Sequence, residues 1–380
     1  MHPLPQEPRE LFPITRSQVF LNHAATSPAS IPLTQAIAAF YGDRLQHAGM
    51  NYRTWMQGVE ETRTLAARLI GADPDEVAFT PNTSQGLGFV AGGIQWTQGD
   101  EILVLRPDFP SNIYPWMHCE RQGARVVFLQ RRQGRISPDD VAARCTARTR
   151  LLALSWVDYQ TGFAADLEGL GRLCRERGIL FCVDAVQGLG VLDMDVNRFQ
   201  IDFLAAGGHK WLLGPMGIGL FFVSHRARHA IEPALVGWRS VVNEEDFSLH
   251  FCLKEDARRF EPGTLNLSGI FGLKASMDLL LDTGIENVRS RIFALNDILH
   301  KELKGRGLQV VSPMDSTQRS GILSFLPPVD PDHCFRALMR RNIVLSLRGG
   351  AIRLSPHFYN NGVDVERFLQ ALDSLPPSFP

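Results

Sequence analysis

The sequence predicts an α/β fold in which a largely parallel sheet carries helices on both of its faces. Short apolar runs, of the length that buried strands have, alternate along the chain with stretches of helical periodicity. One helical stretch, residues 167–177, is followed directly by Gly178, as is common where a helix ends. Strand, helix and strand repeated at this spacing are typical of parallel strands joined by helices. Because ligands of such sheets gather at the carboxyl ends of the strands, we expect the functional residues there.

The strands of this sheet are predicted in the first part of the chain. The segment from Phe79 to Gly88 is interpreted as a strand end, a turn and the start of a helix. Six further strands are predicted at residues 101–105, 124–129, 151–155, 179–183, 203–206 and 217–223.

A second, smaller α/β domain is predicted after about residue 240. The segment 243–259 is charged and irregular, and two long helical patterns follow it at residues 268–281 and 285–303. Shorter strands and helices then alternate, with strands at 321–325, 343–346 and 351–355 and helices at 334–341 and 363–372. We therefore expect a large domain at residues 15–255 and a small domain built from residues 1–14 and 256–380.

Composition and charge exclude several classes of protein. A formal charge of −1 gives no electrostatic reason to bind nucleic acid or an anionic membrane surface. No apolar run approaches the roughly 18 residues of a membrane helix. The segment Met1 to Glu10 has no secretory character, so we expect a cytoplasmic protein. The six cysteines lie far apart without a Cys-x-x-Cys pair, which favours reduced thiols, and no metal site is predicted.

Lys210 is the residue that first indicates chemistry. The chain has 34 arginines and only five lysines, and Lys210 is the first of them. Arginine serves for surface charge, ion pairs and phosphate contacts, but its guanidinium stays protonated and does not attack a carbonyl. A buried lysine loses its proton readily and can form a Schiff base. We therefore predict that Lys210 is a Schiff-base lysine.

Several other segments place polar or aromatic side chains near predicted strand ends. Asp184 closes a strand and is suited to hold a cationic ring nitrogen, although a metal ligand or a salt bridge would also fit. Gln187, three residues on, could reach a phenolic oxygen of the same ring. Thr83 and Ser84 are either an anion site at a helix start or a plain helix cap.

Two further residues have equally balanced interpretations. Phe109 follows the strand at 101–105 and either stacks on a planar cofactor or packs in the core. Arg353 lies in the last predicted strand and binds either a substrate carboxylate or a structural carboxylate.

Together these segments resemble the class V aminotransferase family, which has the fold type I architecture of pyridoxal phosphate (PLP) enzymes. The resemblance runs from about Phe20 to Leu372. The matching motifs are Phe20-Leu-Asn-His-Ala-Ala-Thr-Ser27, 79–86, Gly99-Asp-Glu-Ile-Leu103, Val183-Asp-Ala-Val-Gln187, Gly208-His-Lys210, Arg259-Phe-Glu-Pro-Gly-Thr264 and 353–360. The resemblance implies a mostly parallel seven-stranded sheet between helices in the large domain, with the smaller C-terminal α/β domain beside it.

The resemblance also implies roles for individual residues. Lys210, Asp184 and His209 would be catalytic, with Lys210 as the internal aldimine and Asp184 on the pyridine nitrogen. The implied cofactor contacts further include Thr83, Ser84, Phe109, Asp158, Gln187 and His209. Arg353, Ala25 and His23 would bind a small amino-acid substrate. Thr264 would reach the phosphate in a partner subunit, so a homodimer with shared active sites is expected.

Three departures from the family bear on the reaction. Cysteine desulfurases usually stack a histidine on PLP where this chain has Phe109, and a phosphate-binding serine is replaced by Gly207. The loop before Arg353, residues 348–352, is short and lacks the nucleophilic cysteine of desulfurases.

We therefore expect a substrate that forms an external aldimine and loses its Cα proton, followed by a C–S lyase or desulfurase-like reaction without a persulfide cysteine. The segment 236–240 resembles a stretch of family C–S lyases, and Trp238 and Arg239 in it could contact the substrate or form a structural loop. Transamination and epimerisation share the early steps and remain alternatives. A PLP-fold binding protein without activity is the alternative from another class.

Overall fold

The structure is a computed structural model, and it describes residues 8–132 and 134–375. A seven-stranded sheet forms its centre, with the strand order β2-β8-β7-β6-β5-β3-β4. Only β8 runs against its neighbours, so the mostly parallel sheet that we expected is confirmed. The strands are β2 (Val77–Thr80), β3 (Glu101–Arg106), β4 (Arg125–Gln130), β5 (Thr149–Ser155), β6 (Leu180–Asp184), β7 (Phe203–Gly207) and β8 (Gly219–Val223).

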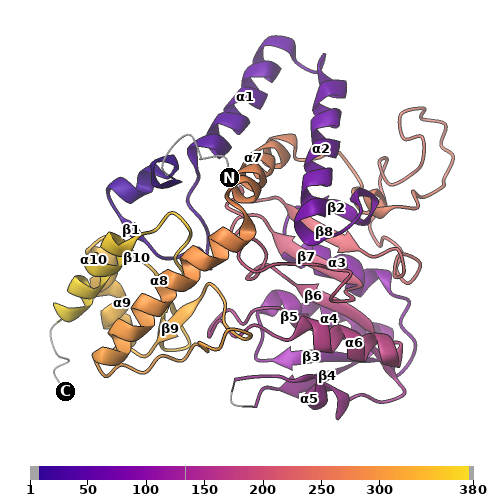
Figure 1. Ribbon diagram of the computed structural model, residues 1–380. Coiled ribbons are helices and arrows are strands. Elements are labelled where there is room, and N and C mark those ends of the chain that lie inside the picture. The colour runs from indigo at the N-terminus through magenta and orange to yellow at the C-terminus, as the bar shows by residue number, and fades with distance from the viewer. Residues whose placement is uncertain (1–7, 133, 376–380) are drawn as a thin grey trace.

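Helices cover both faces of this sheet. One face packs against α3 and α4 through an apolar cluster that includes Phe89 and Trp116. The other face packs against α2, α6 and α7, whose buried residues include Val59, Leu170 and Leu273. The helices of this part are α1 (Ile31–His47), α2 (Tyr52–Ile70), α3 (Thr83–Gly93), α4 (Tyr114–Cys119), α5 (Pro138–Ala142), α6 (Leu167–Arg177) and α7 (Leu267–Thr283). Helices α1 and α2 project beyond the sheet at the top of Figure 1.

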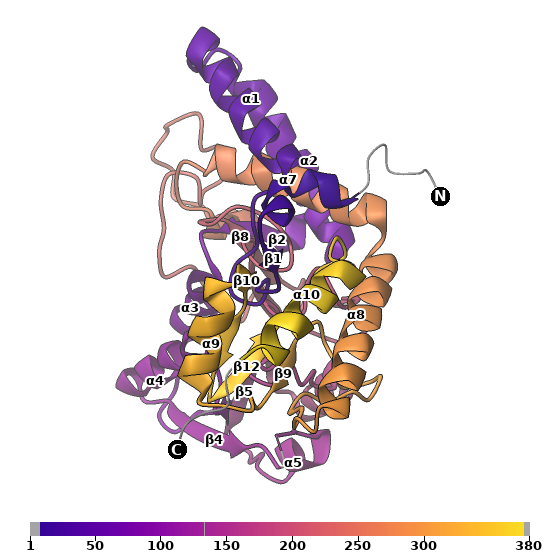
Figure 2. The same ribbon diagram turned by 90° about the vertical axis from the view of Figure 1, so that its left-hand side faces the viewer.

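A smaller unit with its own core lies beside the large sheet, at the left in Figure 1 and towards the viewer in Figure 2. Its three-stranded sheet has the order β11-β12-β9, and a two-stranded sheet pairs β1 with β10. The elements are β1 (Val19–Phe20), α8 (Ile285–Gly305), β9 (Leu323–Phe325), α9 (Pro331–Arg340), β10 (Ile343–Val344), β11 (Ser346–Arg348), β12 (Ala351–Leu354) and α10 (Gly362–Asp373).

The cores divide at a different place from the expected boundary at residue 255. Helix α7 packs against α1 and α2 and shares the core of the large sheet, because its apolar face is covered there. The change of core falls within α8, where Ile292 belongs to the large core and Leu295 to the small one. Strand β1 joins the small unit by parallel pairing of Val19 with Ile343.

Among the residues that the structure describes, no helix is long and apolar enough to cross a membrane. Short 3-10 turns complete the fold at Pro8–Leu11, Pro13–Arg16, Pro74–Glu76, Pro110–Asn112, Glu120–Gln122 and Ala257–Phe260.

Candidate active site

A cavity of about 270 Å³ lies at the carboxyl ends of the central strands, where it meets the small unit. Strand β6 ends at Asp184, and Lys210 follows three residues after the end of β7. The small unit contributes two arginines from its β11–β12 hairpin. The lining residues are Ala24, Ala25, Asn82, Thr83, Ser84, Phe109, Ser111, Tyr159, Asp184, Val186, Gln187, His209, Lys210, Arg348 and Arg353.

Asp184 and Lys210 influence each other's ionisation in this cavity. The carboxylate of Asp184 is only 2% exposed and accepts a hydrogen bond from the backbone N–H of Val186 at 3.0 Å. Burial raises the pKa of Asp184, and the nearby Lys210 ammonium partly offsets that rise. Burial likewise lowers the pKa of the Lys210 amine, which Asp184 opposes. A buried carboxylate and a lysine that gives up its proton readily thus face one space.

Phe109 forms an aromatic wall beside Lys210. The lysine Nζ lies 5.6 Å from the centroid of the Phe109 ring, which also meets Tyr159 edge to face at 5.4 Å. The loop is held by Asp108, whose carboxylate accepts hydrogen bonds from the Ser155 hydroxyl at 2.7 Å and the Ser155 N–H at 3.1 Å. The ring is 42% exposed and therefore available for a planar ligand.

The start of α3 forms the polar end of the cavity. Asn82 caps the helix by accepting from the N–H of Gln85 at 2.9 Å, while Thr83 and Ser84 occupy its first turn. N–H groups of a first turn have no partner within the helix and attract anions. Ser84 also shares a hydrogen bond with the hydroxyl of Ser111 at 2.7 Å. This end suits a phosphate.

Gly207 lies against the same end of the cavity. Its N–H donates to the Thr83 hydroxyl at 2.9 Å, and a Cβ added at Gly207 would lie 3.0 Å from the His209 ring. The absence of a side chain here therefore leaves room for the imidazole of His209. Burial lowers the pKa of His209, and Lys210 lowers it further, so the neutral ring is favoured.

Arg353 lies on the opposite side, on β12. Its side chain is buried and donates to the Tyr159 carbonyl at 2.7 Å and to the Ser346 hydroxyl at 3.4 Å. Its Nε is buried without a partner, and no carboxylate of the described chain forms a salt bridge with Arg353. A buried guanidinium with only neutral partners is suited to a carboxylate ligand.

Three residues expected at the site lie outside the cavity. His23 is fully buried, with Nδ1 at 2.9 Å from the Ser355 carbonyl and Nε2 at 2.7 Å from the Tyr359 hydroxyl. Both ring nitrogens are thus engaged in the core, and His23 does not face a substrate. Asp158 pairs with Arg131 and supports the turn that carries Tyr159. Thr264 lines a separate pocket beside Gly217 and Asn266, and its expected contact with a partner subunit stays a prediction.

The structure also adds residues that sequence reasoning did not select. These are Asn82, Ser111, Tyr159 and Arg348, together with Ala24 and Val186. Asn82 and Ser111 lie within or beside motifs that the sequence analysis selected. The predicted site residues Thr83 and Phe109 close by could therefore have indicated that they line the site. Arg348 had none, because a surface arginine and a site arginine look alike in a sequence. The predicted residues Ala25 and Gln187 do line the cavity, and Gln187 donates to the Ala24 carbonyl at 2.9 Å.

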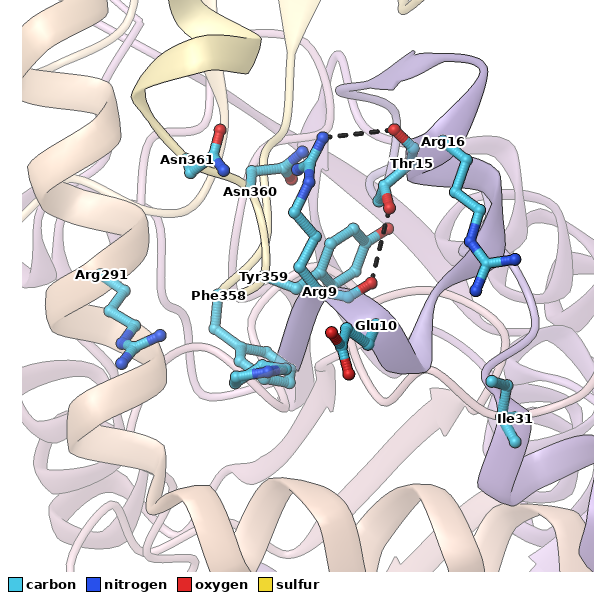
Figure 3. A pocket seen from close by; sticks show the side chains of 11 residues that line it. Arg9, Glu10, Thr15, Arg16, Ile31, Arg291, Phe358, Tyr359, Asn360 and Asn361 are labelled. Carbon is cyan, nitrogen blue, oxygen red and sulfur yellow. Dashed lines mark hydrogen bonds between the residues drawn. The ribbon is translucent and has the colours of Figure 1, made fainter. Parts of the chain in front are cut away.

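A larger cavity, of about 680 Å³, has no comparable chemistry. It lies between the N-terminal turns, α8 and the start of α10, and Figure 3 shows Arg9, Arg291 and Tyr359 around it. Arg9 is already engaged by Asp364 at 2.7 Å and 2.9 Å. No lysine or thiol lines this space, so size alone does not mark it as the active site.

The residues around the smaller cavity fit PLP. Asp184 is a buried carboxylate that hydrogen-bonds only one backbone N–H, as a partner of a pyridinium nitrogen should be. The first turn of α3 and His209 form an anion end, Phe109 offers a ring face, and Lys210 offers the amine. These four features match the pyridinium nitrogen, the phosphate, the planar ring and the carbonyl of the cofactor in turn.

Comparison with known proteins gives the same result. The sequence model described as "Aminotransferase class-V" matches residues 19–368. A "Probable cysteine desulfurase" of Pyrococcus abyssi is 30% identical, with 98% of each chain covered. An "Isopenicillin N epimerase" of Amycolatopsis lactamdurans is 30% identical over 82% of this chain and 84% of its own. The apo structure of a cysteine desulfurase from Thermococcus onnurineus superimposes with a TM-score of 0.90 at 26% identity, covering 98% of each chain. The chain therefore belongs to the aminotransferase class-V family of PLP-dependent enzymes.

Proposed function

We propose that this enzyme acts on a small amino acid, removes its Cα proton and eliminates a sulfur substituent from Cβ, without an enzyme persulfide. The observation that carries the proposal is the cavity itself, which brings Lys210, Asp184 and Arg353 together, and none of the described residues that line it is a cysteine. When bound, PLP supplies an electron sink that lowers the barrier to forming a carbanion at Cα.

Each of these residues has a distinct task. Arg353 binds the α-carboxylate through its guanidinium and so fixes the orientation of Cα. Burial lowers the pKa of the Lys210 amine. This amine accepts the Cα proton and can then donate a proton to the departing sulfur group. Asp184 keeps a proton on the pyridine nitrogen, and Phe109 covers a ring face and excludes water from it.

The positions of the thiols support elimination over a persulfide relay. Cys334 is buried in α9 within the core of the small unit, and burial raises its pKa to about 11. Cys252 is exposed on the irregular segment after β8, outside the lining of the cavity. A persulfide carrier needs a thiolate that can reach the substrate sulfur. We therefore expect release of free sulfide or of a product-bound persulfide.

We further propose a homodimer. The segment that follows β8 has large apolar side chains that are exposed to solvent in the single chain. Among them are Trp238, Phe247, Leu249 and Phe251. Thr264 is exposed and lines a separate pocket, so a second subunit could reach it. Light scattering on the purified protein measures the mass, and a monomer at working concentration would contradict this proposal.

Product analysis of the PLP-loaded enzyme against a panel of L-amino acids tests the reaction. Pyruvate together with sulfide or a persulfide supports elimination. A keto acid formed only with an amino-group acceptor would indicate transamination, and a D-isomer would indicate epimerisation. If amino acids leave the absorbance of the bound cofactor unchanged, the protein is a binding protein without activity.

A further inference from the structure

A second arginine, Arg348, shares the face of the small sheet that carries Arg353. In the β11–β12 hairpin, Ser346 pairs with Arg353 and Arg348 pairs with Ala351. Side chains two positions apart on a strand point to the same face, so Arg348 and Arg353 are diagonal neighbours across the two strands. Both line the cavity that contains Lys210.

The hairpin holds Arg348 by a tight turn. Gly349 and Gly350 form a two-residue connection, with φ values of 56° and 78°. Two positive φ values are the signature of the type I′ turn, which fixes the register of the strands on either side. A Cβ on Gly349 would lie 3.2 Å from Gln160 Oε1, so the turn lies directly against the segment that also carries Tyr159. Arg348 is thus positioned by backbone geometry.

The two guanidiniums have no carboxylate partner in the described chain. Arg353 donates only to the Tyr159 carbonyl and the Ser346 hydroxyl, and Arg348 donates to the carbonyl of its own neighbour Leu347 at 2.8 Å. Burial lowers the pKa of Arg353, and the charge of Arg348 lowers it further, which reflects the proximity of two like charges. The same two arginines also lower the pKa of Lys210.

The nearby anions do not neutralise this pair. Asp158 is engaged by Arg131, and Asp184 lies at the end of β6, where it faces Lys210. The anion end suited to a phosphate is formed by Thr83, Ser84 and His209, on a different element from the hairpin. A single α-carboxylate would neutralise Arg353 and leave Arg348 unpaired at the rim.

We propose that the substrate is an amino acid whose side chain has a second anionic group, such as a carboxylate, beyond the sulfur substituent, and that Arg348 binds this group. This inference rests on the proposed function for the identity of the reacting amino group. It adds the charge of the side chain, which the reaction alone does not determine. Arg353 takes the α-carboxylate at the buried position, and Arg348 takes the distal group at the exposed rim.

A pair of non-reacting ligands tests the charge preference independently of the chemistry. Succinate and its monoamide, succinamate, have nearly the same shape, and neither has an amine that could displace Lys210 from PLP. Calorimetric titration of the PLP-loaded enzyme should give at least about tenfold tighter binding of succinate, as a charge-assisted contact gives. In Arg348→Gln this preference should fall to below about twofold, because the exposed side chain is replaced by a neutral one. Arg340→Gln removes a surface charge from α9 and should keep the full preference.

The same comparison with L-aspartate and L-asparagine, followed by the absorbance of the cofactor, extends the test to amino acids. Equal binding of succinate and succinamate by the wild type would overturn the inference. This result is expected if a carboxylate of a partner subunit already neutralises Arg348. A preference that persists in Arg348→Gln would overturn it as well. If no amino acid of the panel used for product analysis changes the absorbance while succinate is still preferred, the proposed function fails and the anion site stands.

Discussion

Burial of the Lys210 amine lowers its pKa, so this side chain gives up its proton more readily than an exposed lysine does. Lys210→Arg retains the positive charge but cannot form an imine with PLP. We expect this variant to lose turnover completely while its far-ultraviolet circular dichroism stays that of the wild type. Borohydride reduction of the wild-type holoenzyme, followed by peptide mapping, should label Lys210. A label on Lys254, Lys274 or another lysine would contradict the assignment.

Asp184 should matter for the rate more than for binding of the cofactor. Asp184→Asn keeps the shape of the side chain but no longer favours a protonated pyridine nitrogen. We expect PLP to bind still, measured by absorbance titration, and turnover to fall by at least about a hundredfold, the lower end of what positioned proton chemistry contributes. Wild-type rates in this variant would place the electron-sink role on another residue.

The thiols can be tested directly. Cys252→Ser and Cys334→Ser, singly and together, should leave turnover within a few fold, since neither side chain lines the cavity. A collapse of activity with unchanged PLP binding would show that a relay thiol exists and would refute elimination without one.

At the residue scale, the sequence was sufficient where a motif determines which way a side chain points. Asp184 and Lys210 follow strand ends directly, so the edge of the parallel sheet brings them together. His23 stands in an equally specific motif but turns into the core, where Ser355 and Tyr359 satisfy both ring nitrogens. That outcome depends on a partner more than 300 positions away, which no local pattern reveals.

At the scale of elements, the first turn of α10 is anchored by one buried carboxylate. Asp364 is 1% exposed and accepts from Arg9, from the Asn360 amide at 2.8 Å and from the Asn361 N–H at 3.3 Å. This arrangement joins the N-terminal turns to the helix start beside the larger cavity of Figure 3.

Asp364→Ala should therefore destabilise the fold by about 3 kcal/mol, because it leaves the partly buried Arg9 and two polar donors without their partner. Urea unfolding followed by fluorescence measures the change. Asp332→Ala, at an exposed position in the first turn of α9, is the matched control and should cost at most about 0.5 kcal/mol. Equal effects of the two substitutions would show that the anchor contributes nothing.

Elements of the large sheet were largely predictable, and the division between units was not. The strands at 101–105 and 203–206 match β3 and β7 to within one residue at each end, because their apolar runs have no competing interpretation. The apolar residues of α7 predicted a buried helix as clearly as the apolar runs predicted these strands. They did not say which core covers it, and the packing against α1 and α2 assigns α7 to the large unit.

At the scale of the whole molecule, two buried histidines lie where the large and small units meet. The rings of His23 and His357 are 5.0 Å apart, and His357 Nε2 is 3.2 Å from the Trp211 carbonyl. Burial lowers the pKa of His357 to about 4 and that of His23 well below its usual value. Both rings are therefore neutral in the folded protein near neutral pH.

This arrangement predicts that the two histidines disfavour the folded state in mild acid. In the unfolded chain both histidines take up a proton near pH 6.5, whereas the folded protein resists protonation down to about pH 4 for His357. The contribution of His357 to the free energy of unfolding should thus fall by up to about 3 kcal/mol as pH decreases from about 6.5 to 4, while the raised pKa of the buried Asp184 acts in the opposite direction. Urea unfolding at a series of pH values measures this. The difference between the wild type and His357→Gln isolates the contribution of His357, and replacement of the exposed His118 by Gln, the surface control, should retain that contribution.

The pairing of β1 with the small unit also has a consequence for biosynthesis. The Ser355 hydroxyl donates to the carbonyl of Leu21, a partner 334 positions earlier in the chain. Val19 pairs with Ile343, which is likewise made late in synthesis. A ribosome would release most of the large sheet, including Lys210 and Asp184, long before the strand that carries Arg353 is made. The nascent chain can therefore contain the residues expected to hold the cofactor before Arg353, the residue expected to bind the substrate carboxylate, has been translated. Pairing of the small unit with its own amino-terminal strand thus needs the same late part of the chain that brings Arg353 to the site.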